Sequence, residues 1–118
     1  SKGKLRRSNR AFSVKPSVVI DNDLSDEFTV VEVEGLDRPG LLSELTRALA
    51  DLNLNIASAH IATFGEKVID AFYVRDLVGH KITASSRQAR IVETLLAVLG
   101  PQQRGEEPPR PAARGRSA

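Results

Sequence analysis

The sequence predicts an α+β domain of four strands and two helices in the order β–β–α–β–β–α. The spacing of apolar residues changes along the chain between the period of two typical of strands and the period of about 3.6 typical of helices. Gly, Pro, Asn and Asp residues, which form turns, stand at the points where this period changes. These two observations delimit each of the six elements.

The charged residues divide the chain into three parts. Residues 1–16 contain six basic and no acidic residues, residues 17–100 have a net charge of −6, and residues 101–118 have a net charge of +2. The last part is rich in Pro, Gly and Arg and cannot bury enough surface to fold. We therefore predict a basic interdomain linker over residues 1–16, a folded domain over residues 17–100 and a disordered tail over residues 101–118.

The composition excludes several classes of protein. The chain has no Cys, which excludes thiol catalysis and zinc–thiolate sites, and its two His residues stand apart. No run of about 18 apolar residues could span a membrane, and the N-terminus does not have the pattern of a signal peptide. We expect a cytoplasmic protein with no metal site and no membrane contact, and the initial Ser1 suggests a piece of a longer chain.

The first half of the domain contains two strands and a helix. Residues 18–21 alternate between apolar and polar positions, and Pro16 places this strand at a sheet edge or breaks it near Lys15. Residues 28–34 are alternating and rich in β-branched side chains, which is typical of a strand. Residues 40–52 form a helix with an apolar face made of Leu41, Leu45, Ala48, Leu49 and Leu52.

The second half contains a hairpin and another helix. Two strands, over residues 56–63 and 67–75, are separated by a short turn that contains Gly65. A helix over residues 85–99 has Ser85 or Ser86 as its N-cap and ends at Gly100. Its predicted apolar stripe consists of Val92, Leu95, Leu96 and Leu99.

This order of elements corresponds to a ferredoxin-like βαββαβ unit whose last strand is missing. Nothing after Pro101 has the composition of a strand. We predict that residues 18–21 take the empty position at the sheet edge, because a hairpin into residues 28–34 reaches it with the same antiparallel polarity.

No group of residues suited to catalysis is evident, and we predict no catalytic residues. His60 shares a predicted strand face with Ile56 and Ser58, which is typical of a half-exposed strand histidine. Asp70 is unusual, because it falls on an otherwise apolar strand face. A position at the end of the hairpin or a local bulge would explain it without a function.

The same order of elements occurs in RNA-binding modules, which stack bases on exposed aromatic residues of the central strands. Phe72 is expected to pack under the helices, which leaves Tyr73 as the exposed aromatic residue. A domain with a net charge of −6 also repels phosphate. We predict no nucleic-acid binding, and a loose contact through the basic residues 1–10 stays an alternative.

The turn before the first helix has the chemistry of a ligand site. The first helical amides, around Gly40, Leu41 and Leu42, lack intrahelical partners and lie at the positive end of the helix dipole, which suits a carboxylate. Asp37 could accept a hydrogen bond from an ammonium group. Together these groups suit an amino acid, although a capped turn without a ligand explains the same residues.

Two motifs accompany this Asp-Arg-Pro-Gly-Leu-Leu turn: N-x-N-I-x-x-A-x-I over residues 53–61 and D-x-F-Y-V over residues 70–74. Together they resemble the ACT domain, a small regulatory module that binds amino acids. With residues 12–22 included, nearly the whole chain is similar to the C-terminal end of the GlnD family. These are the bifunctional uridylyltransferases and uridylyl-removing enzymes of the PII nitrogen-signalling proteins.

The resemblance implies a glutamine-sensing regulatory domain without a cofactor, while the catalytic centres and their Mg²⁺ belong to a parent enzyme. It implies three partners: L-glutamine, another ACT domain (a tandem copy or a homodimer), and the PII protein through the parent enzyme. An ACT-type pairing scaffold that binds no ligand is the alternative function. The ligand would lie between two domains, held by Leu36, Asp37, Arg38, Pro39, Gly40, Leu41 and Leu42 of one and by Asn55, Ile56 and Ser58 of the facing strand.

Overall fold

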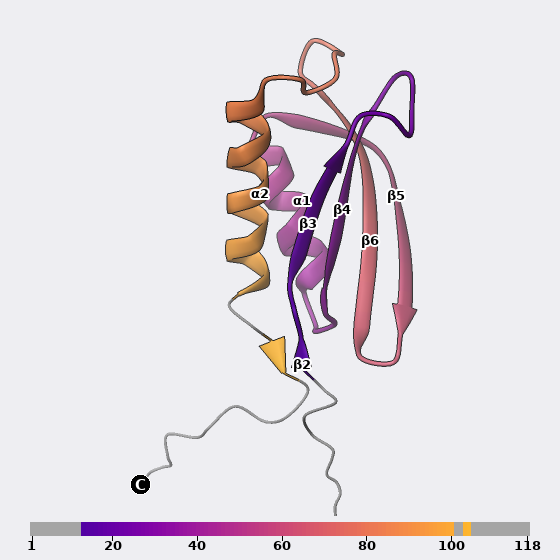
Figure 1. Ribbon diagram of the computed structural model, residues 1–118, viewed down its shortest axis with the longest axis vertical. Helices are drawn as coiled ribbons and strands as arrows, with labels where there is room; N and C mark the ends of the chain where they lie inside the picture. The colour runs from indigo at the N-terminus through magenta and orange to yellow at the C-terminus, as the bar shows by residue number, and fades with distance from the viewer. Residues whose placement is uncertain (1–12, 101–102, 105–118) are drawn as a thin grey trace, which may run out of the picture.

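The computed structural model describes residues 13–100 and 103–104 (Figure 1). All six predicted elements are present in the predicted order, and the strand after the first helix is longer than expected at both ends. In chain order the elements are β2 (Ser13–Val14), β3 (Ser17–Asp21), β4 (Thr29–Leu36), α1 (Leu41–Asp51), β5 (Leu54–Phe64), β6 (Lys67–Asp76), α2 (Ser85–Leu99) and β7 (Gln103–Arg104).

Four of the strands form one antiparallel sheet in the order β3-β4-β6-β5, which confirms the α+β ferredoxin-like arrangement. The edge position beside β4 is filled by β3, whose register runs from Ser17 opposite Glu34 to Asp21 opposite Val30. The predicted replacement of the missing last strand is therefore confirmed. The chain breaks between β2 and β3 at Lys15 and Pro16, as the missing amide of proline requires.

The two helices pack on one face of the sheet and enclose the core. In Figure 1, α2 lies toward the β3 edge, whereas β5 is at the opposite edge of the sheet. Phe72, at 0% exposure, lies in the centre of the core, and the predicted apolar face of α1 is confirmed. The residues that fill the core are Val31, Val33, Leu41, Leu45, Leu49, Leu54, Val68, Phe72, Val74, Ile82, Ile91, Leu95 and Leu99.

Two details predicted for α2 are wrong. The helix buries Ile91, Leu95 and Leu99, whereas Leu96 is partly exposed, because the helix is apolar on more than one face and its spacing alone does not identify the buried one. The N-cap is Ala84 and no side chain caps this end. The side-chain amide of Gln88 instead donates to the Ile82 carbonyl at 2.8 Å and anchors the start of the helix.

A hydrogen-bond network joins the β3–β4 turn to the segment before α2. The buried Thr29 hydroxyl donates to the side-chain carbonyl of Asn22 at 2.6 Å and accepts the Ile82 N–H at 2.8 Å. The Asn22 amide donates to the Ile82 carbonyl at 2.9 Å. Polar groups of three segments therefore satisfy one another's hydrogen bonds, and the network fixes the β3–β4 turn to the segment before α2.

The prediction that no strand follows Pro101 is wrong for two residues. Gln103 and Arg104 form β7, which pairs antiparallel with Ser13 and Val14 of β2. This pairing uses backbone groups and requires no apolar side chain, so composition did not reveal it. The rest of the predicted linker and tail, residues 1–12, 101–102 and 105–118, lies outside the described residues.

Candidate ligand site

The segment between β4 and α1 forms a tight turn at one end of the sheet. Gly40 has a φ of 82°, in the left-handed region that favours glycine. The Leu41 N–H donates to the Arg38 carbonyl at 3.2 Å. The Asp37 N–H donates to the Glu66 carbonyl at 2.7 Å, and Glu66 lies in the turn between β5 and β6. The two turns are therefore fixed side by side.

The first turn of α1 offers amide groups to an anion. No side chain hydrogen-bonds to its N-terminus, and the first intrahelical bond runs from the Glu44 N–H to the Gly40 carbonyl at 3.0 Å. The Leu41 N–H is occupied by Arg38, which differs from the predicted set of free amides. The amides of Leu42 and Ser43 follow it in the same turn and point along the helix axis, where a carboxylate is favoured.

Arg38 is engaged within the protein. Its guanidinium makes two hydrogen bonds to the Glu44 carboxylate, at 2.9 and 3.0 Å, and one to the Val98 carbonyl at 3.1 Å. The hydrogen bonds from Arg38 lower the pKa of Glu44, and those to Glu44 raise the pKa of Arg38. Arg38 thus connects the turn to both helices, and it is not free to bind a ligand.

Asp70 lies inside the sheet and contradicts both explanations expected for it. It pairs with Val33 of β4 and Ile61 of β5 within continuous ladders, and the register irregularity is elsewhere, between Ile56 and Ser58. Its side chain is 2% exposed, and its Oδ1 atom has no hydrogen-bond partner among the described residues. Burial, and after it the charge of Asp37, raises the pKa of Asp70.

The predicted strand residues Asn55, Ile56 and Ser58 lie away from the turn within one chain. The turn follows Leu36, which is level with Lys67, and Lys67 is paired with Phe64 at the far end of β5. Ser58 is six residues from Phe64, or about 20 Å along the strand at the usual rise per residue. One ligand cannot touch both groups unless a second domain supplies one of them.

The irregularity in β5 changes which residues share a face. Ile56 is opposite Val74 on the helix side and packs partly against the core, whereas Ser58 is opposite Tyr73 on the open side. The predicted common face of Ile56, Ser58 and His60 is therefore wrong for Ile56. A bulge shifts the alternation by one residue, and the sequence pattern carries no sign of it.

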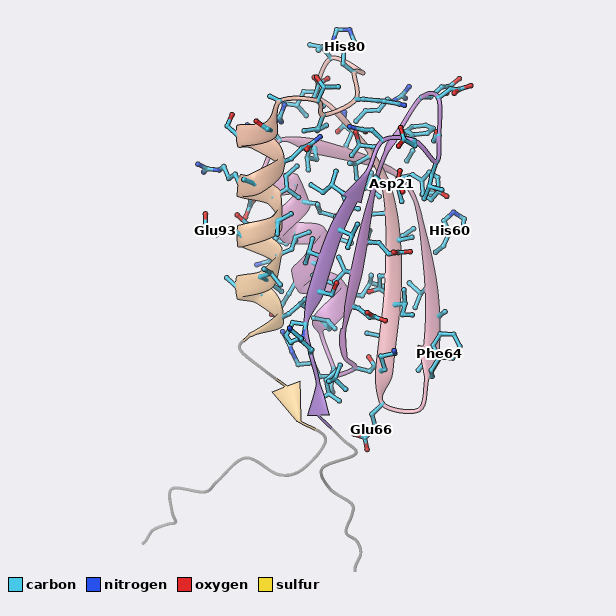
Figure 2. All side chains as sticks on the ribbon, in the orientation of Figure 1. Asp21, His60, Phe64, Glu66, His80 and Glu93 are labelled. Atoms are coloured by element: carbon cyan, nitrogen blue, oxygen red, sulfur yellow. The ribbon has the colours of Figure 1, made fainter. Side chains whose placement is uncertain are left out.

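The edge of β5 is bare. Its sequence, LNIASAHIATF, contains no Asp, Glu, Lys, Arg or Pro, and its residues from Ala57 to Phe64 are exposed. Figure 2 shows His60 and Phe64 projecting from this edge away from the helices. Ile61 shares the helix-side face with Asp70 and is 50% exposed, so α1 does not cover this half of the strand.

An aromatic cluster on the open face was not expected from the sequence. The Tyr73 ring makes edge contacts with His60 at 5.2 Å and with Phe28 at 6.3 Å between centroids. The Arg75 guanidinium lies 4.6 Å from the centre of the Phe28 ring. These rings pack on one another, and Val30, in the same face, is buried at 1% exposure. The cluster therefore has the character of a small second core.

Other features of the described residues offer weaker sites. A hollow of about 350 Å³ lies between the end of α1 and the start of α2, but there Arg87 donates to the carbonyls of Leu52 and Asn53 and so closes the helix end. Within residues 13–100 and 103–104, no group of His, Asp and Glu side chains could hold a metal ion. No helix in this part is long and apolar enough to cross a membrane.

Comparison with known proteins identifies the fold family. The ACT domain family matches residues 29–92, which is more than half of the chain, and the chain therefore belongs to the ACT domain family. A solved structure described as an unknown protein from Galdieria sulphuraria is 24% identical, with a TM-score of 0.48. The match covers 66% of this chain and spans 44% of the length of that one. ACT domains are regulatory modules that bind amino acids and often pair with other ACT domains.

Proposed function

We propose that this ACT domain senses L-glutamine at a site shared with a second ACT domain, and that it regulates a parent enzyme of the GlnD family. The observation that carries the proposal is the bare edge of β5, which ends beside the uncapped start of α1. The edge offers a place for the second domain, and the start of the helix offers a place for the ligand.

Pairing through β5 follows from the chemistry of sheet edges. An exposed strand of this length presents a row of unpaired backbone groups, and proteins usually protect such an edge with charges, Pro or a covering element. β5 contains no charged residue or Pro, and no element of the described residues covers its outer edge. A second domain that adds its own β5 would satisfy the free backbone groups and cover Ile61.

An antiparallel pair of β5 strands would also complete the site. Because the two strands run in opposite directions about a two-fold axis, the first half of one lies beside the second half of the other. Asn55, Ile56 and Ser58 of the second domain would then approach the turn that begins at Asp37. This arrangement explains how predicted site residues that are far apart in one chain serve one ligand.

The ligand chemistry fits a zwitterion. The free amides at the start of α1 would bind the carboxylate, and Asp37 would accept from the ammonium group. Side-chain and backbone amides of the second domain would accept and donate to the carboxamide of glutamine. The turn residues Leu36, Pro39 and Leu41 shape this site, and Gly40 allows the backbone to approach the ligand closely.

Regulation would follow from linkage. Glutamine bound between two ACT domains stabilises the arrangement in which both halves of the site meet, and only this difference in affinity can shift a distant equilibrium. In a parent enzyme of the GlnD family, that shift would favour removal of UMP from PII over its transfer. The nucleotidyl-transfer chemistry and its Mg²⁺ would belong to other domains of the parent.

The test is calorimetric titration of the full chain with L-glutamine at concentrations where sedimentation shows pairs. We expect binding of one ligand per chain, and we expect Asp37→Ala to remove it. Asp51→Ala changes an exposed carboxylate at the other end of α1 and should bind as the unmodified chain does. Paired chains that give no heat with L-glutamine would instead indicate a pairing scaffold.

A further inference from the structure

Asp70 is the buried ionisable group for which the fold offers no explanation. It is 2% exposed, and its Oδ1 atom has no partner in the described part of the chain. It stands between Val68 and Phe72 on the core side of β6, where other positions are apolar. A polar group that is buried without a hydrogen bond weakens the fold, so its presence calls for a compensating role.

The surroundings of Asp70 belong to the ligand site. Two of its neighbours in the sheet, Val33 and Ile61, are apolar. Asp70 is opposite Val33, which stands three residues before the end of β4 at Leu36, so the carboxyl group lies about 10 Å along the strand from the turn that leads into α1. Asp37 at the turn is near enough for its charge to act on Asp70. Both residues therefore lie near the end of the sheet where the turn into α1 begins.

The cations of this end of the chain are committed elsewhere. Arg38 is held by Glu44 and the Val98 carbonyl, and Lys67 forms an ion pair with Glu34 at 3.2 Å on the opposite face of the sheet. No positive group of the described residues is hydrogen-bonded to Asp70. In its ionised form, this carboxyl group therefore has no balancing cation among the described residues.

The strand next to Asp70 is open to solvent, although the carboxyl group itself is buried. Ile61, directly opposite Asp70 on the same face, is 50% exposed, and Thr63 beyond it is exposed as well. Solvent therefore reaches the position next to the carboxyl group. A ligand bound over Ile61 and Thr63, with its carboxylate at the α1 amides, would bring its ammonium group close to Asp70.

We propose that Asp70 is a ligand-binding residue that receives the ammonium group of an amino acid whose carboxylate is held at the start of α1. The inference rests on the proposed function and deepens it. Asp70 and Asp37 then share the ammonium group, and both are required for tight binding. The arrangement selects α-amino acids against carboxylates that lack the amino group, because only the former satisfy the buried oxygen.

The experiment compares two ligands on two forms of the full chain. The ligands are L-glutamine and 4-carbamoylbutanoate, which is glutamine without its ammonium group. We expect the unmodified chain to prefer L-glutamine by about ten- to hundredfold, the usual effect of one hydrogen bond to a charged group. In Asp70→Asn this preference should fall at least about tenfold, with 4-carbamoylbutanoate bound as before.

Controls separate a ligand contact from a loss of folding. Glu32→Gln removes a carboxylate from the opposite face of the neighbouring strand and should keep the full preference. Asp70→Ser, with a smaller side chain, should lose the preference as Asp70→Asn does, and circular dichroism should show both variants folded.

Each outcome decides one question. An unchanged preference for L-glutamine in folded Asp70→Asn or Asp70→Ser overturns this inference and leaves the proposed function intact. An unmodified chain that binds neither ligand overturns both. An unmodified chain that binds the two ligands equally does not recognise the ammonium group, which overturns the roles given to both Asp70 and Asp37.

Discussion

The two edges of the sheet differ in length, charge and cover. β3 has five residues, follows Pro16 and ends at Asp21, and α2 packs against it. β5 has 11 residues, carries no charged side chain and is exposed over most of its length. Natural sheets protect their edges, so this difference between the two edges favours the proposed pairing through β5.

The loops next to the two edges show the same difference. On the β3 side, Thr29, Asn22 and Ile82 satisfy one another's polar groups in a closed network. On the β5 side, the start of α1 has no side-chain cap and Asp70 has an unpartnered oxygen. The polar groups beside the closed edge are satisfied within the described residues, whereas those beside the open edge are not.

The largest expected effect comes from a charge on the open edge. Ile61→Lys places two uncompensated lysines in the interface of a β5 pair, and such like charges in an interface cost several kcal/mol. We expect self-association to weaken at least about a hundredfold. Sedimentation equilibrium measures this constant.

Val19→Lys is the matched control on the closed edge. Val19 is 51% exposed and Ile61 is 50% exposed, so the two substitutions place the same charge at sheet edges of equal accessibility. Self-association in Val19→Lys should stay within about threefold of the unmodified chain. If Val19→Lys dissociated the pairs and Ile61→Lys did not, the assignment of the two edges would be reversed.

A smaller effect, on the free energy of unfolding, is expected when a threonine is replaced by valine on the β3 side and on the β5 side of the sheet. Thr29→Val removes the hydroxyl at the centre of the closed network and leaves the buried Ile82 N–H without its acceptor. We expect a loss of about 1–3 kcal/mol in the free energy of unfolding. Thr63→Val on the exposed strand should change it by less than about 0.5 kcal/mol. Urea unfolding of the two variants measures the difference, and equal losses would contradict a closed β3 side.

Asp70→Asn should alter stability in a pH-dependent way. Since the pKa of Asp70 is raised in the folded chain, the folded state loses stability as the pH rises from the unfolded value, about 3.9, through the folded value. Asp70→Asn does not have this loss. It should therefore match the unmodified chain below about pH 4 and exceed it at higher pH, by about 1.4 kcal/mol for each unit of the shift.

Urea unfolding between pH 3 and pH 8 tests this dependence. Glu32→Gln, on an exposed position, should stay within about 0.5 kcal/mol of the unmodified chain over the whole range. If the free energies of unfolding of Asp70→Asn and the unmodified chain differed by the same amount at all pH values, burial would not raise the pKa of Asp70, and the prediction would be wrong.

Most of the fold follows from local patterns, and this explains what could be predicted. The alternation in residues 18–21 and the following turn determine a hairpin, so the position of β3 in the sheet could be derived before the structure. The bulge in β5 could not, because an extra residue changes no residue type and yet moves Ile56 to the other face. The buried face of α2 was missed for a similar reason, since its apolar residues surround more than one side.

The candidate site was predicted in part. The turn chemistry indicated Asp37, Gly40 and the helix amides, but the use of the Leu41 amide by Arg38 depends on the turn geometry. Asp70 was noticed in the sequence as an acid among apolar residues. Its buried place near the end of β4 required the register of β4, β5 and β6, which long-range pairing determines.

The most direct test of a site shared between two chains is complementation. Asp37→Ala removes the turn half of the site, and Asn55→Ala removes the facing strand half, so neither variant alone should bind L-glutamine. In an equimolar mixture of exchanging pairs, half of the pairs contain both variants, and one of the two sites in each such pair is intact. We predict recovery of about a quarter of the unmodified binding capacity by calorimetry. A mixture that stays as inactive as its components, while sedimentation shows mixed pairs, would contradict a site built across the β5 edge.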